Sequence, residues 1–331
     1  MTKIANQITA AVQILKSGEP VAFPTETVYG LGADATNPTA VQKIYAIKQR
    51  PFDHPLIVHI GDTAQLSHWA QKIPDSAWQL ARHFWPGPLT LILQRSSNVP
   101  DIVTGGQDTV GIRVPAHPIA LALLKSLEPS HALAAPSANR FGRISPTMAA
   151  HVQQELGDKI DMILDGGVCT VGLESTIVYF KNETVFVIRP GGIPITALES
   201  VLNKPVIQSN KEHLGIRTSG TLPTHYAPTT PLTIYPINHL WESAVKFATH
   251  GSRIIVIFWS DNNKKLSVSH PLIQQHIMSS DPIIYGKELY ATLRQFDHQL
   301  FDHIFIEAPP DHPSWLAISD RLQRASQPSK S

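Results

Sequence analysis

Short apolar runs alternate with amphipathic segments in the N-terminal part of the chain. Runs of strand length predict buried strands, and apolar side chains spaced by three or four residues predict helices. The expected strands are 21–23, 55–60, 89–93, 110–114, 161–165, 175–180 and 184–190. The expected helices are 1–17, 38–48, 62–72, 75–85, 117–128, 145–156 and 194–202. Strands and helices alternate early and hairpin-like pairs come late, which predicts a twisted, mixed α/β sheet.

The composition changes at residue 203, where a polar segment rich in proline and glycine begins. Such a segment is typical of a linker. Beyond it, apolar runs and amphipathic segments alternate again and predict a small Rossmann-like α/β domain. We therefore expect three parts, namely a catalytic domain at 1–202, a linker at 203–231 and a C-terminal domain at 232–331.

The bulk numbers exclude several classes of protein. A net charge of +1 over 331 residues provides no basic field of the kind that a dedicated nucleic-acid binder has. The single cysteine, Cys169, has no partner for an internal disulfide, which fits a reducing compartment. No apolar segment has the length of a membrane span or the form of a signal peptide. We expect a soluble, cytoplasmic protein.

Candidate chemistry first gathers around the loop 24–32, PTETVYGLG, which carries three hydroxyl side chains. Its glycines allow the backbone to come close to a bound molecule. The following helix ends with Lys48 and Arg50, and Pro51 stops it there. Cations at a helix end also have a purely structural interpretation, because they favour the helix dipole. Together with the loop, however, they indicate a site for an anionic ligand.

Two further side chains are unusual for their positions. His59 lies near the end of an apolar strand, where a histidine is most often part of the core. Arg113 lies within an apolar strand, and a buried guanidinium is costly without an anionic partner. That partner is either a ligand carboxylate or a nearby Asp or Glu of the chain.

Three other kinds of site find little support. Gly30, Gly32 and Ala35 match the dinucleotide fingerprint G-x-G-x-x-A, but they do not lie directly between a strand and a helix. No Walker-type phosphate loop is present. Neither Cys169 nor the histidines show metal-ligand spacing, so we expect no bound structural metal.

The loop 24–32 and the segment 48–60 resemble the signature of the YrdC-type threonylcarbamoyl-AMP synthases. The resemblance continues through DTVGIRVP, APSAN, ISPT, GLESTI and IRPGG, and it ends with HYAP and a C-terminal domain. The last two features are typical of the longer, two-domain form of the family. Several such motifs in the family's order are far more specific than any one alone. The implied fold is a YrdC-like domain with a twisted mixed sheet, followed by the small Rossmann-like domain.

The resemblance implies that L-threonine, bicarbonate and ATP react to threonylcarbamoyl-AMP and pyrophosphate, with Mg²⁺ carried by the nucleotide. The product would serve a downstream tRNA-modifying transferase complex that acts on the adenosine next to the anticodon. No residue indicates direct contact with tRNA. The implied catalytic residues are Lys48 and Arg50. The implied ATP-binding residues are Arg50, His54, Thr109, Ser137, Asn139, Ser145, Arg189 and Tyr226. The implied threonine-binding residues are Thr27, His59, Arg113, Ala135 and Ser175.

The chain departs from the family pattern at two places. His54 stands where asparagine is common, and Ser219 stands where the family's linker usually has proline. We expect the linker to act as a lid, with Tyr226 against the nucleotide. Ser145 is also a good candidate for a helix N-cap. Two other function classes stay open, namely an RNA-binding module and a carbamoyl-phosphate-handling enzyme of the same fold.

Overall fold

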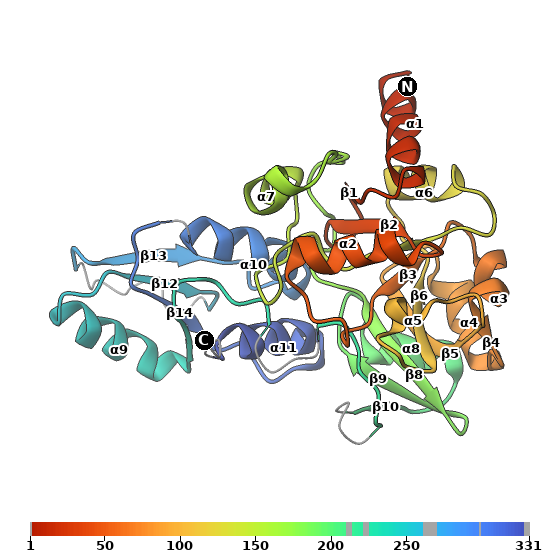
Figure 1. Cartoon of the computed structure of the whole chain (residues 1–331). Helices are drawn as coiled ribbons and strands as arrows, with labels where there is room; N and C mark the ends of the chain where they lie inside the picture. Colours follow the sequence, from red (N-terminus) through yellow and green to blue (C-terminus); the bar gives the residue numbers. More distant parts are fainter. Residues whose placement is uncertain (1, 210–213, 221–224, 261–269, 298, 328–331) are drawn as a thin grey trace. The chain divides into compact units, whose positions relative to one another are not determined.

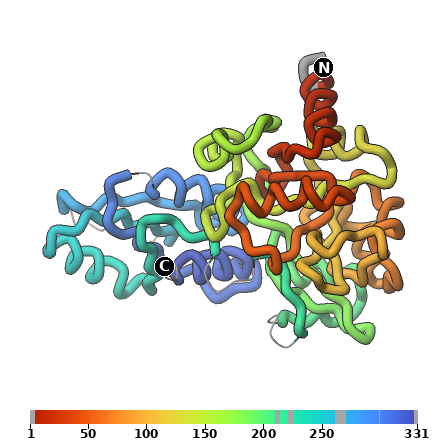
Figure 2. The backbone as a smooth tube through the Cα atoms, viewed as in Figure 1, coloured from red at the N-terminus to blue at the C-terminus, as the bar shows by residue number. Residues whose placement is uncertain are grey.

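The computed structural model describes residues 2–209, 214–220, 225–260, 270–297 and 299–327. The chain forms two compact units, which Figure 2 shows as a continuous tube. The first contains residues 1–141 and 145–221, and the second contains residues 142–144 and 222–331. No helix among the described residues has the length and apolar character needed to cross a membrane.

The first unit is built on a mixed sheet in the order β1-β2-β7-β3-β6-β5-β8-β9-β10, with β4 beside β5 (Figure 1). Its strands are β1 Val21–Phe23, β2 Gly30–Asp34, β3 Ile57–His59, β4 Ala70–Gln71, β5 Leu89–Arg95, β6 Thr109–Arg113, β7 Leu133–Ala134, β8 Thr176–Lys181, β9 Thr184–Arg189 and β10 Val206–Gln208. Parallel and antiparallel pairs both occur, so the expectation of a mixed α/β sheet is confirmed.

Helices pack around this sheet. They are α1 Thr2–Lys16, α2 Pro38–Lys48, α3 Leu66–Trp69, α4 Asp75–Phe84, α5 Asp101–Thr104, α6 Pro118–Lys125, α7 Ala149–Leu156 and α8 Ile195–Leu202, with short 3₁₀ turns η1 Thr63–Gln65 and η2 Gly157–Lys159. The start of α2 follows from local chemistry: Asn37 accepts hydrogen bonds from the N–H groups of Thr39 and Ala40. The buried face of α2, which includes Val41 and Ile44, joins the main apolar core.

Several expected elements of the first unit are wrong. The helix expected at 62–72 is only η1 followed by α3, and Ala70–Gln71 form strand β4. Residues 30–32, expected in a loop, belong to strand β2. Residues 161–165 form no strand, and only Ile163 makes an isolated bridge, to Ala22. Ser145 is not a helix N-cap, because α7 begins only at Ala149. Residues 145–148 are not helical, and the N–H of the loop residue Tyr29 donates to Pro146 O. A tertiary hydrogen bond thus overrides a local signal.

Two described parts of the expected linker pack on the first unit. Val206–Gln208 form strand β10, parallel to β9. Ile216 packs in a small apolar cluster with Ile92, Ile177 and Ile188. Residues 210–213 and 221–224 of the expected linker lie outside the described residues.

The second unit contains a four-stranded parallel sheet in the order β11-β14-β12-β13. Its elements are β11 Leu232–Tyr235, α9 Ile237–Thr249, β12 Ile254–Phe258, β13 Ile273–Ile277, α10 Pro282–Asp297, β14 His303–Glu307, η5 Pro313–Trp315 and α11 Leu316–Ala325. The expected Rossmann-like arrangement is confirmed. Strand β13 was not predicted, since its interior residues Gln274, Gln275 and His276 are polar and provide no strand signal.

Candidate active site

One face of the sheet carries much of the expected site. Side chains on a strand alternate between faces, so Thr109, Gly111 and Arg113 of β6 share one face. Parallel pairing of β3 with β6 places His59 beside Arg113 in register. Sheet register thus joins two residues from distant parts of the sequence.

The hydroxyl loop reaches the same place. Arg113 Nη1 donates a hydrogen bond of 2.9 Å to Thr27 Oγ1, and its Nε donates to Gly87 O at 3.2 Å. Thr27 Oγ1 also lies 2.8 Å from Thr25 Oγ1. Thr27 and Arg113, two residues expected to bind threonine, are therefore in direct contact and buried.

Arg113 has an anionic partner within the chain, Glu26, which sequence reasoning did not single out. Arg113 Nη2 lies 2.7 Å from Glu26 Oε1. Of the two kinds of partner that the sequence left open for Arg113, the structure contains a carboxylate of the chain itself. The signal that could have revealed Glu26 is an acidic residue between two threonines in a loop expected to contact a ligand. Its other oxygen, Oε2, accepts a hydrogen bond from the N–H of Ala116 at 3.0 Å.

His59 is a neutral group in this site. Burial, and then the nearby charge of Arg113, lower the pKa of His59 from 6.5 to about 3. Its Nδ1 lies 3.2 Å from Ile57 O, and because a carbonyl only accepts, Nδ1 carries the proton. In this tautomer Nε2 is an acceptor.

The APSAN loop runs beside the hydroxyl loop. The N–H of Leu31 donates to Pro136 O, and the N–H of Ala138 donates to Tyr29 O. Ala135 is anchored to β3, since its N–H donates to Ile57 O. These backbone bonds hold the two expected binding loops together at the edge of the sheet.

Lys48 contacts this second loop directly. Its Nζ donates to Ser137 O at 2.6 Å and also to Asn139 O. The side chain is almost completely buried, and burial followed by the charge of Arg50 lowers its pKa well below the ordinary value. Lys48 therefore positions the backbone of the expected ATP-binding loop.

Arg50 lies at the other side of this loop and touches the linker. Its Nη2 donates to Pro55 O at 2.9 Å and to Ser219 Oγ at 3.2 Å. The guanidinium also lies over the Phe141 ring, 5.6 Å from its centroid. His54, which departs from the family pattern, contributes its carbonyl to Arg50 Nε and packs its ring against Phe141.

Arg189 is the second buried arginine among the expected ATP-binding residues. Its Nη2 donates to Ser175 O at 2.9 Å and to Ser175 Oγ at 3.1 Å. Its Nη1 donates to Ser219 O at 3.0 Å. Ser219 thus contacts both Arg189 and Arg50. Ser145, another expected ATP-binding residue, is buried. Its hydroxyl donates a hydrogen bond to Glu174 Oε1 at 2.6 Å.

A narrow crevice lies on this face of the sheet, and the linker forms one of its walls. The sheet side includes Ile57, Thr109, Gly111 and Ile177, and the linker side is formed by residues 217–219. Arg217 holds the linker there, because its N–H and carbonyl both bond to the Gln107 side chain, at 2.6 and 3.0 Å.

Tyr226 belongs to the second unit, unlike the other expected site residues. Its ring stacks on Tyr290 with centroids 5.7 Å apart, and the Arg321 guanidinium lies 5.1 Å from its centroid. The Tyr226 side chain is buried.

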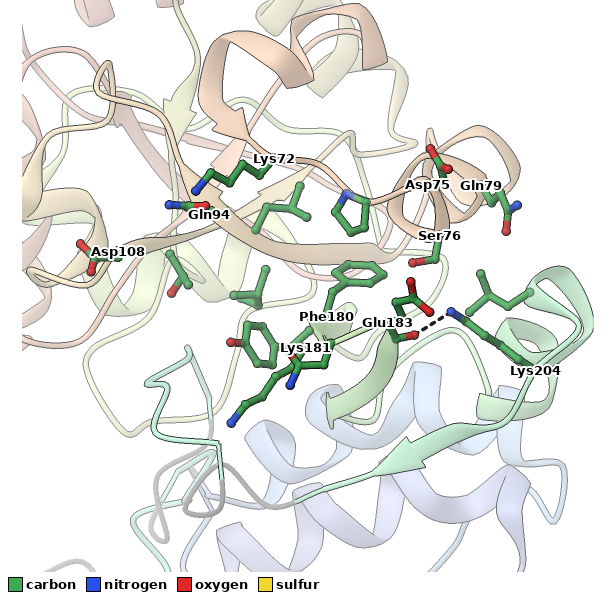
Figure 3. Close-up of a pocket in the computed structure, with 17 residues that line it drawn as sticks. Lys72, Asp75, Ser76, Gln79, Gln94, Asp108, Phe180, Lys181, Glu183 and Lys204 are labelled. Carbon is green, nitrogen blue, oxygen red and sulfur yellow. Dashed lines mark hydrogen bonds between the residues drawn. The ribbon is translucent and has the colours of Figure 1, made fainter.

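A larger pocket of about 840 Å³ opens on the first unit (Figure 3), and it shares Thr109 with the crevice. Lysines 72, 181 and 204 and acidic residues 75, 108 and 183 line it, and Thr109 is the expected site residue that it includes. Lys204 Nζ donates to Glu183 O at 2.7 Å. Opposite charges are thus mixed around this pocket.

Comparisons with known proteins cover both units. The model of the family described as "Telomere recombination" matches residues 13–191, and that of the "Threonylcarbamoyl-AMP synthase, C-terminal domain" matches residues 193–327. The threonylcarbamoyl-AMP synthase of Pyrococcus abyssi is 37% identical, over 97% of this chain and 94% of its own. That of Bacillus subtilis is 40% identical, over 97% of this chain and 93% of its own.

A solved structure gives the same result. The crystal structure of P. abyssi Sua5 in complex with L-threonine is 37% identical, with a TM-score of 0.86 and coverage of 96% of this chain and 94% of that chain. Sequence and fold therefore agree over both units. The chain belongs to the threonylcarbamoyl-AMP synthases of the two-domain Sua5 type.

Proposed function

We propose that the chain converts L-threonine, bicarbonate and ATP to threonylcarbamoyl-AMP and pyrophosphate, as a nucleotidyltransferase. The product supplies the threonylcarbamoyl group for modification of the tRNA adenosine next to the anticodon. The observation that carries the proposal is the gathering of Thr27, His59 and Arg113 on the same unit as the buried cations Arg50 and Arg189. An amino acid and a nucleotide phosphate both require such charges.

The two substrates take different parts of this site. L-Threonine lies beside Thr27, His59 and Arg113, where the guanidinium supplies the positive charge for its carboxylate. ATP lies near Thr109, with its phosphates toward Arg50 and Arg189. Ser175 contacts Arg189 of the ATP group, and its hydroxyl lies 2.7 Å from that of Thr90.

The reaction needs positioning and charge neutralisation more than acid–base catalysis. Bicarbonate takes up the proton that the threonine ammonium loses and breaks down to carbon dioxide and water. The neutral amine then adds to carbon dioxide, releases a second proton to solvent and forms a carbamate. A carbamate oxygen then attacks the α-phosphorus of ATP, the bond from that phosphorus to the bridging oxygen breaks, and pyrophosphate leaves. The buried arginines stabilise the charge on the phosphates, and Lys48 keeps the Ser137–Asn139 backbone in place. Low exposure of the site limits hydrolysis of the carbamate and the adenylate.

A Mg²⁺ ion bound to ATP would neutralise phosphate charge. Among the described residues no three His, Cys, Asp or Glu side chains gather as a metal site, so no protein carboxylate cluster is assigned to the ion. Delivery of the product to a tRNA-modifying transferase complex in the cytoplasm belongs to the same proposal.

The test is an assay of pyrophosphate release, with mass spectrometry of the nucleotide product. Both signals should require ATP, bicarbonate and L-threonine together, and labelled bicarbonate should enter the product. Arg50→Ala should abolish most turnover, while Arg82→Ala, an exposed arginine of α4, should not. Equal turnover without threonine would contradict the proposal, and turnover of carbamoyl phosphate instead would favour the other enzyme class.

A further inference from the structure

The pair Glu26 and Arg113 contains two buried atoms that lack a hydrogen bond. Glu26 Oε1 and Arg113 Nη2 are 2.7 Å apart, close enough for an ion pair, yet no N–H of Nη2 points at Oε1 well enough for a hydrogen bond. Both atoms are almost fully covered and have no other hydrogen-bond partner. Buried charges of this kind are costly unless they are also hydrogen-bonded.

Everything else in the pair is held in place. Arg113 donates through Nε and Nη1 to Gly87 O and Thr27 Oγ1, so its guanidinium is fixed on two sides. Glu26 Oε2 accepts from Ala116 N, and the Glu26 backbone carbonyl accepts from Val171 N at 2.8 Å. The unsatisfied donor and acceptor therefore face each other on two anchored side chains.

We propose that Glu26 is the positioning residue for the α-ammonium group of the amino-acid substrate, and that Glu26 and Arg113 together recognise its zwitterion. This inference rests on the proposed function and names a recognition group for the same site. On binding, the substrate carboxylate takes Arg113 Nη2 and the ammonium takes Glu26 Oε1. One ion pair with poor geometry is replaced by two charge-assisted hydrogen bonds.

The surroundings favour this assignment. His59, which pairs in register with Arg113, is neutral because burial and Arg113 keep its pKa near 3. It therefore does not repel an ammonium group. Glu174, the other buried carboxylate of the loops, accepts from Ser145 on the side of the expected ATP residues. Glu26 is thus the carboxylate placed for the amine.

The test is calorimetry on the full chain with three ligands: L-threonine, 3-hydroxybutanoate, which lacks the ammonium group, and L-threoninol, which lacks the carboxylate. Weak binders are measured by competition with L-threonine. Glu26→Gln keeps the shape of the side chain and an acceptor for Ala116 N. We expect it to weaken L-threonine at least tenfold and to leave ATP affinity unchanged.

The decisive readout is the desamino ligand. Glu26→Gln should bind 3-hydroxybutanoate at least as tightly as the wild type does, because the competing carboxylate beside Arg113 is gone. Arg113→Gln should show the reverse pattern, losing 3-hydroxybutanoate and retaining L-threoninol. Glu26→Asp should recover part of the L-threonine affinity, and Glu128→Gln, an exposed carboxylate, is the matched control.

Three outcomes separate the possibilities. If Glu26→Gln weakens L-threonine and 3-hydroxybutanoate equally, Glu26 only holds the fold of the loop and the inference is overturned. Unchanged L-threonine affinity in Glu26→Gln overturns it as well, while the proposed function stands. If the wild type binds no L-threonine, the proposed function itself fails.

Discussion

Arg50 Nη2 donates a hydrogen bond to Ser219 Oγ across 169 positions of sequence. Ser219 Oγ in turn donates to Pro55 O at 2.7 Å. One linker hydroxyl thus connects an expected phosphate-binding cation with the segment that leads into β3. The usual proline of the family has no hydroxyl for either bond. The hydroxyl of Ser219 therefore gives the linker two attachments that a proline side chain could not provide.

This attachment predicts the effect of removing the hydroxyl. Ser219→Ala loses two hydrogen bonds, which should lower the free energy of local opening of residues 216–220 by about 1–3 kcal/mol. Hydrogen exchange of the amides in this segment measures it. Ser126→Ala, which removes an exposed hydroxyl bond in α6, is the control, and equal exchange in both variants would contradict the prediction.

The two hydrogen bonds between the Gln107 side chain and the Arg217 backbone allow a test of how ligands affect the linker. Trypsin can cleave after the exposed Arg217, and ATP with L-threonine should slow this cleavage if the linker closes over the nucleotide. Gln107→Ala removes both bonds to the Arg217 backbone and should speed the cleavage without ligand. Cleavage rates that do not respond to ligands would rule out a role as a lid.

The separation of the cations predicts a division of binding. Arg50→Ala should mainly weaken ATP, and Arg113→Ala should mainly weaken L-threonine. Loss of a charge-assisted contact to a desolvated anion should cost about 2–5 kcal/mol of affinity. Calorimetry with each ligand checks this, and the loss of one and the same ligand by both variants would refute the division.

His59 predicts a pH dependence of stability. Its pKa is about 3 in the folded chain and 6.5 in the ordinary state, so below pH 6.5 the unfolded chain binds a proton that the folded chain does not. Stability should therefore fall as the pH falls from about 6.5 toward 3. Relative to His59→Gln, the wild type should lose about 2–3 kcal/mol between pH 7 and pH 4. Chemical denaturation of both proteins at each pH measures the difference, and parallel profiles would disprove it.

Tyr226 predicts a stability effect in the second unit. Its ring is buried between Tyr290 and Arg321, so Tyr226→Ala should cost about 3–5 kcal/mol of unfolding free energy. Tyr226→Phe keeps the ring and should retain most of the stability. If Tyr226→Phe nevertheless weakens ATP, the hydroxyl also serves the nucleotide, as the family resemblance implies. Thermal unfolding and ATP titration of both variants distinguish these roles.

The sequence by itself determined the features that depend on neighbouring residues. The helix expected at 38–48 begins at Pro38, and Asn37 caps it, because capping is a local interaction. Apolar runs predicted β6 and β12, since a buried strand needs apolar side chains along its own length. The motif order predicted the family, and both units agree with it.

Only the tertiary structure decided which side chains meet. Glu26 became the partner of Arg113, and Ser219 the partner of Arg50, through strand register and loop placement. The same forces removed the expected N-cap at Ser145, whose hydroxyl bonds to Glu174 instead. Contacts between distant residues depend on how the whole sheet assembles, and no local propensity encodes them. The sequence could thus name the cations of the site, while the fold alone supplied their partners.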